Sequence, residues 1–224
     1  MASDVAGPPV VGARVVHAVT TDAIALAPDF AARARGVMAA LGPRGALHLR
    51  APLAGGRRLF EMTAALVEDA RASGCALVVN DRLDVALAAG ADGVQLTSRS
   101  MRPAEARDAV ERSGGQLAVG ASVHELEEAR AAAGAGADWL VAGHVFPTPS
   151  HTGAPGRGVA FLRQVAAAVS CPVIGIGGVL PRHLPLLRAA GASGAAVIRG
   201  IWDAADPEAA ASDYLTAYDA DGRA

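Results

Sequence analysis

The stretch Ala89-Gly90-Ala91-Asp92-Gly93-Val94-Gln95-Leu96 joins the end of one predicted helix to a short apolar strand. Glycine just after a helical segment is typical of a helix C-cap, because it adopts left-handed backbone angles at little steric cost. The junction recurs in Ala135-Gly136-Ala137-Asp138 and in Ala190-Gly191-Ala192-Ser193-Gly194. About two strand–helix units separate each of these glycines from the next, which predicts a chain built from a repeated βα unit.

On both sides of these junctions, short apolar runs alternate with longer segments of helical period. The runs are apolar at nearly every position, as is typical of parallel strands buried on both faces. Eight such pairs predict one α/β domain, a single (β/α)8 TIM barrel over residues 14–220, after a flexible tail over residues 1–13. An open doubly wound sheet is the alternative, but the G-x-G-x-x-G turn of that fold does not follow the first strand. The predicted strands are Arg14–Val19, Gly45–Arg50, Ala76–Asn80, Gly93–Leu96, Gln116–Ala121, Trp139–Gly143, Val173–Ile176 and Gly194–Ile198.

All 20 basic residues of this 224-residue chain are arginine. The absence of lysine excludes Schiff-base aldolases, pyridoxal phosphate enzymes and P-loop NTPases, since each needs a lysine amine. The net charge is −2, with acids and bases interspersed, which predicts no nucleic-acid partner. No apolar run reaches membrane-spanning length, no signal peptide is evident, and Cys75 and Cys171 fit buried thiols, so we expect a cytoplasmic protein with no membrane partner.

In such a barrel, the active site lies where strands end and βα loops begin. The last two loops, with Gly177-Gly178 and Arg199-Gly200, lie where barrels commonly bind a phosphate through backbone N–H groups. Glycine is needed there because a side chain would block the approach of the phosphate, so a small phosphate monoester is the predicted ligand. The Pro/Gly-rich segment 143–158 is too long for a tight connector and predicts a lid or substrate loop. Other polar residues at the strand ends are His17, His48, Arg50, Asn80, Asp81, Gln95, Ser122, His124 and His144.

Five segments together resemble a known family. They are Asn80-Asp81-Arg82, Asp92-Gly93-Val94-Gln95-Leu96, Gly120-Ala121-Ser122-Val123-His124-Glu125-Leu126-Glu127-Glu128-Ala129, Gly143-His144-Val145-Phe146 and Ile176-Gly177-Gly178. They are similar to motifs of the thiamine phosphate synthase/TenI superfamily, and the similarity runs from His17-Ala18-Val19-Thr20 to the final helix. This resemblance implies a barrel enzyme of one of two branches.

The synthase branch joins a pyrimidine diphosphate to a thiazole phosphate. It must hold pyrophosphate and Mg²⁺, which calls for cationic side chains and paired carboxylates. The branch signature Q-L-R-x-K appears here as His48-Leu49-Arg50-Ala51-Pro52, without lysine. The metal signature D-G-V-H-x-G-Q-x-D runs from Asp92 to Ser100, with Ser100 in place of the second metal aspartate. The T-x-(T/S)-K loop reads Thr148-Pro149-Ser150-His151, again without lysine.

These three departures favour the TenI branch, so we expect a thiazole tautomerase. This isomerase of thiamine biosynthesis converts a thiazole carboxylate phosphate to its aromatic tautomer, here with no metal or organic cofactor. Proton transfer near neutral pH suits histidine. His124 matches the catalytic histidine of the family, and His17 and His144 are candidates for a proton relay. Arg50 is expected to bind the substrate carboxylate or to pair with Asp81. The resemblance also implies that Asn80, Asp81, Gln95 and Ser122 contact or orient the substrate.

Two other functions stay open at this point. One is thiamine phosphate synthase, which would need Mg²⁺, and the other is a non-catalytic regulator that binds thiazole phosphate or thiamine phosphate. The expected partner is in each case a small phosphorylated thiazole. Whether the chain forms a homodimer is left open.

Overall fold

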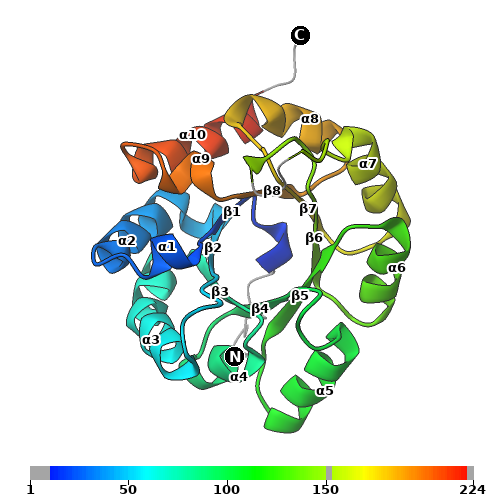
Figure 1. The fold of residues 1–224 in the computed structure, drawn as a ribbon. Coiled ribbons are helices and arrows are strands. Elements are labelled where there is room, and N and C mark those ends of the chain that lie inside the picture. The colour runs from blue at the N-terminus through cyan, green and yellow to red at the C-terminus, as the bar shows by residue number, and fades with distance from the viewer. Residues whose placement is uncertain (1–10, 150–152, 221–224) are drawn as a thin grey trace, which may run out of the picture.

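The computed structural model describes residues 11–149 and 153–220, and these form a closed barrel of eight parallel strands (Figure 1). The strands are β1 (Val16–Val19), β2 (Gly45–Leu49), β3 (Ala76–Asn80), β4 (Gly93–Leu96), β5 (Ala118–Val123), β6 (Trp139–Gly143), β7 (Val173–Ile176) and β8 (Gly194–Val197). Each strand pairs with the next in the chain, and β8 pairs with β1. The prediction of a single (β/α)8 TIM barrel is therefore confirmed.

Helices surround the ring of strands, as Figure 1 shows. Their apolar faces cover the strands and build an aliphatic core. The α-helices are α1 (Asp22–Ala25), α2 (Phe30–Leu41), α3 (Gly56–Ser73), α4 (Leu83–Ala89), α5 (Pro103–Ser113), α6 (Leu126–Gly134), α7 (Gly158–Ala168), α8 (Leu184–Ala189), α9 (Arg199–Trp202) and α10 (Pro207–Asp219). Short 3-10 turns are η1 (Val11–Ala13), η2 (Gly42–Arg44) and η4 (Pro181–His183).

The repeated Ala-Gly-Ala junctions fix where strands enter the barrel. Their three glycines have φ angles between 74° and 89°, in the left-handed region that glycine adopts readily. Where the repeat ends in aspartate, the carboxylate binds the neighbouring strand. Asp92 accepts a hydrogen bond from the N–H of Leu77 at 2.7 Å, and Asp138 accepts one from the N–H of Val119 at 2.6 Å. Asp92 thus sets the register between β3 and β4, and Asp138 sets the register between β5 and β6.

Trp139 fills the lower part of the barrel interior. Its side chain is fully buried, and a Cβ on Gly120 would lie only 2.1 Å from its Cε2 atom, so that position requires glycine. Below it, η1 closes the barrel and appears as a dark blue turn inside the ring in Figure 1. Val11 is buried in the same cluster, so Val11–Ala13 are packed rather than part of the predicted flexible tail. The rest of that tail, residues 1–10, lies outside the described residues.

Strand β5 is shifted from its predicted position at Gln116–Ala121. It continues because Ser122 pairs with Val141, and Val123 with Ala142, on the neighbouring strand. Sequence hydropathy suggested an earlier end, since serine is polar. The extension places Ser122 inside the rim of the barrel instead of in a loop. The remaining strands match their predicted ranges to within one residue at either end, except that β1 begins two residues later, at Val16.

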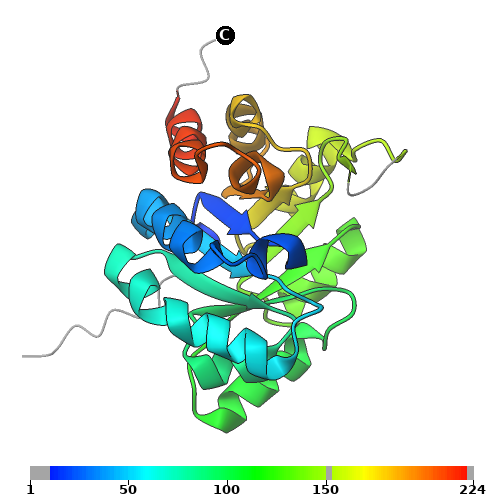
Figure 2. The same ribbon diagram turned by 60° about the vertical axis from the view of Figure 1, so that its left-hand side comes forward.

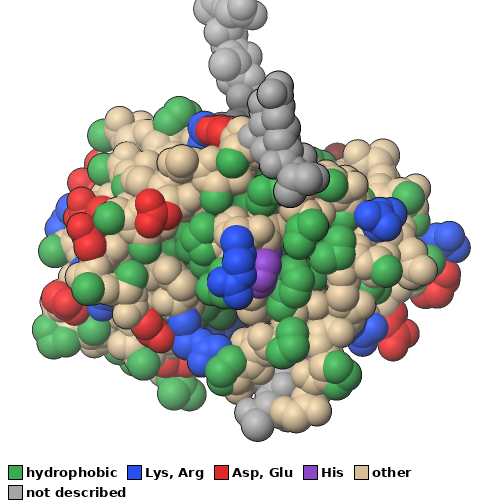
Figure 3. All heavy atoms as spheres, turned by 90° about the horizontal axis from the view of Figure 1, so that it is seen from above, with side chains coloured by type: hydrophobic (Ala, Val, Ile, Leu, Met, Phe, Trp, Pro, Cys, Tyr) green, Lys and Arg blue, Asp and Glu red, His purple; other side chains and the backbone are tan. Residues whose placement is uncertain are grey.

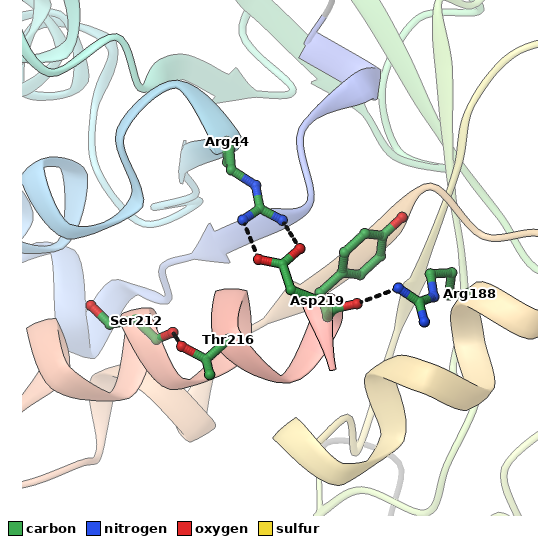
Figure 4. Close-up of polar contacts among 6 residues, drawn as sticks. Arg44, Arg188, Ser212, Thr216 and Asp219 are labelled. Carbon is green, nitrogen blue, oxygen red and sulfur yellow. Dashed lines mark hydrogen bonds and ion pairs between the residues drawn. The ribbon is translucent and has the colours of Figure 1, made fainter. Parts of the chain in front are cut away.

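The last helix, α10, packs between α2 and α8 and brings the end of the fold next to its beginning (Figures 1 and 2). Arg44 binds both carboxylate oxygens of Asp219, at 2.6 and 2.7 Å, and this hydrogen bonding lowers the pKa of the Asp219 carboxyl (Figure 4). On the other side, Arg188 donates to the carbonyl oxygen of Tyr218 at 2.8 Å. The C-terminal end of α10 is therefore held by two arginines from opposite neighbours.

The outer surface carries charges of both signs. On the face shown in Figure 3, arginine and acidic side chains are interspersed with apolar ones. None of the helices in the described part of the chain is long and apolar enough to cross a membrane.

Candidate active site

A cavity of about 530 Å³ opens at the carboxyl ends of the strands, where the active site of a (β/α)8 barrel is expected. Its walls come from the residues that follow β2 and β4 and from the ends of β5 to β8. Eight of the predicted site residues line it: Arg50, Ser122, His124, His144, Gly177, Gly178, Arg199 and Gly200. The structure thus brings together predicted residues from the ends of five different strands.

The cavity is strongly electropositive. Three arginines, Arg50, Arg99 and Arg199, line it together with two histidines, whereas no aspartate or glutamate is among the described residues of its wall. None of these arginines forms an ion pair with another described residue. Arg199 donates a hydrogen bond to Thr148 Oγ1 at 3.2 Å. The ion pair between Arg50 and Asp81 that the sequence left open is therefore absent. Three guanidinium groups without counter-charges favour a polyanionic ligand.

Gly177 and Gly178 connect β7 to η4 with φ angles of 98° and 63°. A Cβ on Gly178 would lie 2.4 Å from the carbonyl oxygen of Pro147, so the segment after β6 crosses directly over this turn. The N–H groups of both glycines donate to no other described residue. They are available at the cavity wall to a ligand oxygen, as expected for a phosphate site.

Gly200 has a different reason to be glycine. A Cβ there would lie 2.1 Å from the hydroxyl oxygen of Tyr214. That hydroxyl donates to the carbonyl oxygen of Val179 at 2.9 Å and so ties α10 to the loop after β7. The glycine allows this packing, and the helix start at Arg199 lies beside the cavity.

His124 follows β5 and is exposed at the cavity mouth. Its Nδ1 lies 3.0 Å from the carbonyl oxygen of Gly143. Since a carbonyl oxygen only accepts, Nδ1 carries the proton, and Nε2 of the neutral ring is left as an acceptor. His144 also lines the cavity, and its Nε2 donates to the carbonyl oxygen of Pro155 at 3.2 Å.

His17 does not reach the cavity. It is fully buried inside the barrel, because β1 runs on to Val19 after it. Its Nε2 donates to the carbonyl oxygen of Arg14 at 3.2 Å, so its Nδ1 accepts from Nε2 of His48 at 2.8 Å. Burial lowers the pKa of His17 to about 4. Burial, and then the proximity of His17, lowers the pKa of His48 well below its usual value. This neutral pair supports the barrel from within rather than touching a ligand.

Asp81 lies behind the cavity wall and organises the loop after β4. Its Oδ1 accepts from the N–H of Thr97 at 3.0 Å, from Thr97 Oγ1 at 2.6 Å and from Ser100 Oγ. Asp81 has a positive φ of 64°, which aspartate tolerates better than most residues. Within the described chain, no group of three histidine, cysteine, aspartate or glutamate side chains is placed to hold a metal ion.

Asn80 and Gln95 are buried side by side on β3 and β4, where they are paired in the ladder. Gln95 Nε2 donates to Ser122 Oγ at 3.1 Å, and Ser122 reaches the cavity wall. The two amide oxygens, Asn80 Oδ1 and Gln95 Oε1, have no hydrogen-bond partner among the described residues. A buried acceptor without a donor is costly, but neither residue is among those that line the cavity, so these oxygens are not placed to meet a ligand there.

Sequence reasoning missed Arg99, which lines the cavity. It lies in a short polar loop with no motif of its own, and only its place after β4 could have indicated it. The segment 143–158 was predicted as a lid or substrate loop. Its described part contributes Pro147 and Thr148 to the cavity wall, and residues 150–152 lie outside the described residues. His183 packs against this segment, because the centroids of its ring and of the Phe146 ring lie 4.1 Å apart.

The chain resembles known proteins over nearly its whole length. The thiamine monophosphate synthase (TMP-TENI) family matches residues 16–201. The thiamine-phosphate synthase of Methanoculleus marisnigri is 40% identical over 190 residues, 83% of this chain and 89% of that one. The thiamine-phosphate synthase of Anaeromyxobacter dehalogenans is 43% identical over 188 residues, 78% of this chain and 83% of that one. A solved structure of thiamine phosphate pyrophosphorylase from Pyrococcus furiosus superimposes with a TM-score of 0.80 at 32% identity, covering 92% of this chain and 96% of that one.

These comparisons contradict the prediction of a thiazole tautomerase, and with it the isomerase class. The relatives at this level of identity are named as synthases, and so is the family. The prediction was wrong because it gave three side-chain departures, at Pro52, Ser100 and His151, more weight than the similarity of the whole barrel. The prediction that no cofactor is needed is untested by the comparisons.

Proposed function

The chain belongs to the thiamine monophosphate synthase/TenI family, and on this basis we propose that it is a thiamine-phosphate synthase. Such a transferase joins a pyrimidine diphosphate to a thiazole phosphate and releases pyrophosphate. The observation that carries the proposal is the cavity wall, which presents Arg50, Arg99 and Arg199 and no described carboxylate. Two substrates with three phosphate groups between them need such an excess of positive charge.

Breaking the bond between the pyrimidine methylene carbon and its diphosphate leaves negative charge on the departing oxygen. Fixed guanidinium donors stabilise charge that develops in this way, and they act more strongly inside a cavity than in water. Arg50 is partly buried at the end of β2 and has its guanidinium unpaired, so it is suited to this role. The chain thereby supplies part of the electrostatic stabilisation itself.

The thiazole phosphate fits the opposite wall. Gly177 and Gly178 offer two backbone N–H groups, and Arg199 adds a cation beside them. This arrangement suits a phosphate monoester, as the sequence predicted. Seating the monophosphate there and the diphosphate near Arg50 would place the two rings between them, in the part of the cavity lined by Val141 and Ile176.

Ring recognition is assigned to the polar groups at the rim. Ser122 lines the cavity, where Gln95 Nε2 donates to its Oγ, and its hydroxyl suits a polar atom of a heterocycle. His124 presents Nε2 as an acceptor at the mouth, so it can hold or take a proton from a bound substrate. His17 is excluded from this role by its burial.

The family implies Mg²⁺, and the residues present do not fit a two-carboxylate metal site. The first aspartate of the metal signature, Asp92, precedes β4 and accepts from the N–H of Leu77. Asp81 is the carboxylate beside Ser100, and its Oδ1 already accepts from Thr97 and Ser100. Ser100 replaces the second aspartate with a neutral hydroxyl. Magnesium sites usually combine carboxylates with substrate phosphates, so we derive no step through a metal.

The proposal is tested by pyrophosphate release from pyrimidine diphosphate, with and without thiazole phosphate. We expect release that requires both substrates. Arg50→Gln should lower kcat/KM about 10- to 100-fold, the effect of removing one hydrogen-bonded charge. Arg163→Gln is the matched control, because Arg163 is an exposed arginine on α7 outside the cavity. Tight binding of both substrates by a folded protein that releases no pyrophosphate would instead support the non-catalytic regulator.

A further inference from the structure

The loop between β4 and α5 lacks the final carboxylate of the metal signature and carries an arginine next to that position. In the metal signature D-G-V-H-x-G-Q-x-D, the final aspartate is Ser100 here, and the variable position before it is Arg99. One potential negative charge is absent and one positive charge is present at neighbouring positions. Because the loop has no carboxylate at its last signature position and has an arginine beside it, it is poorly suited to a divalent cation and well suited to an anion.

The structure shows what holds this loop. Asp81 Oδ1 accepts from the backbone and side chain of Thr97 and from the hydroxyl of Ser100. The N–H of Thr97 also lies 3.1 Å from Ser100 Oγ. Arg99 lies between the two clamped residues and lines the cavity, and it forms no ion pair with another described residue. The Asp81 carboxylate thus fixes the loop segment that carries Arg99.

We propose that Arg99, held by Asp81, Thr97 and Ser100, binds the substrate diphosphate together with Arg50, so that the diphosphate is bound without a divalent cation. This inference rests on the proposed function for the identity of the ligand. A guanidinium presents several donors in one plane and binds phosphate oxygens in pairs, and its charge does not depend on pH in the working range. Two such groups carry the same total charge as one magnesium ion.

The test is calorimetric binding of inorganic pyrophosphate to the whole protein in EDTA. We expect binding by the wild type that added Mg²⁺ does not strengthen. Arg99→Gln should weaken it by about tenfold or more, as for a lost hydrogen bond between charged groups, while Arg163→Gln leaves it unchanged. Arg99 is exposed, so its variant should keep the wild-type melting temperature. Pyrophosphate binding that appears only with Mg²⁺, or equal affinity in Arg99→Gln, would overturn the proposal.

A second variant tests the same loop by restoring the missing charge. Ser100→Asp places a second carboxylate beside Asp81, and Arg99→Gln in the same chain removes the competing cation. We expect this double variant to bind Mn²⁺, measured by electron paramagnetic resonance, while the wild type does not. Mn²⁺ binding by the wild type would contradict the inference.

The outcomes separate this inference from the proposed function. If pyrophosphate binds in EDTA and the synthase assay is silent, the arginine site stands and the transferase does not. If the assay succeeds only with Mg²⁺ and pyrophosphate binding needs the metal too, the transferase stands and the arginine site does not.

Discussion

The buried His17–His48 pair makes the stability of the barrel depend on pH. Both rings are neutral in the fold, and burial lowers the pKa of His17 from 6.5 to about 4. In the unfolded chain the pKa of His17 returns to its ordinary value, so between pH 6.5 and pH 4 the unfolded state binds more protons than the folded state. The free energy of unfolding therefore falls as pH decreases through this window. At about 1.4 kcal/mol per pH unit, His17 alone removes about 3 kcal/mol at pH 4, and His48 acts in the same direction.

The measurement is urea unfolding followed by tryptophan fluorescence at several pH values from 7 to 4. Carboxylates also titrate there, so the informative quantity is the difference between the wild type and His17→Gln, which cannot titrate at this position. The variant should be less stable at pH 7, and its deficit should shrink by about 3 kcal/mol on reaching pH 4. Arg163→Gln, at an exposed position, removes no group that titrates between pH 7 and 4, so it is the control whose difference from the wild type should stay nearly constant. A deficit for His17→Gln that does not change with pH would refute the reasoning.

Three other changes have expected outcomes. Gly120→Ala forces a methyl group against Trp139 and should lower the free energy of unfolding by about 1–3 kcal/mol in urea titrations. An unchanged free energy of unfolding would show that the barrel interior around Trp139 is loosely packed. Gly178→Val places a branched side chain at a positive φ against the carbonyl of Pro147, and should raise KM for thiazole phosphate more than it lowers kcat; an unchanged KM would remove this turn from the phosphate site. Arg44→Met removes the exposed ion pair with Asp219 and should lower stability by at most about 1 kcal/mol at low salt, an effect that disappears in high salt; a loss that persists in high salt would point to packing instead of charge.

Most of the fold could be predicted from the sequence because its signals are local. The apolar runs and the helix-ending glycines at Gly90, Gly136 and Gly191 show where strands and helices alternate. Strand ends were harder to place. Ser122 lies in β5 because it pairs with a neighbouring strand, and hydropathy along the chain does not reveal that partner. Val11 is packed for the same reason, since the interior it helps to fill is made by distant segments.

The site was predicted in part, and the errors have a common cause. Residues that follow a strand, such as His124 and Arg199, reach the cavity as expected, because the end of a parallel strand always faces that side of the barrel. His17 was placed at the mouth, but it lies inside the strand and points into the barrel. Arg99 was overlooked, since its role depends on a clamp from Asp81 that spans two loops. Side-chain direction and contacts between loops are set by tertiary structure.

The most decisive measurement is mass spectrometry of a reaction that contains pyrimidine diphosphate, thiazole phosphate and the purified protein. A thiamine-phosphate synthase predicts one new product whose mass equals that of the two substrates less pyrophosphate, formed in step with the pyrophosphate released. The proposed function would be contradicted if a folded protein left both substrates intact in a reaction with Mg²⁺ and also in a reaction with EDTA.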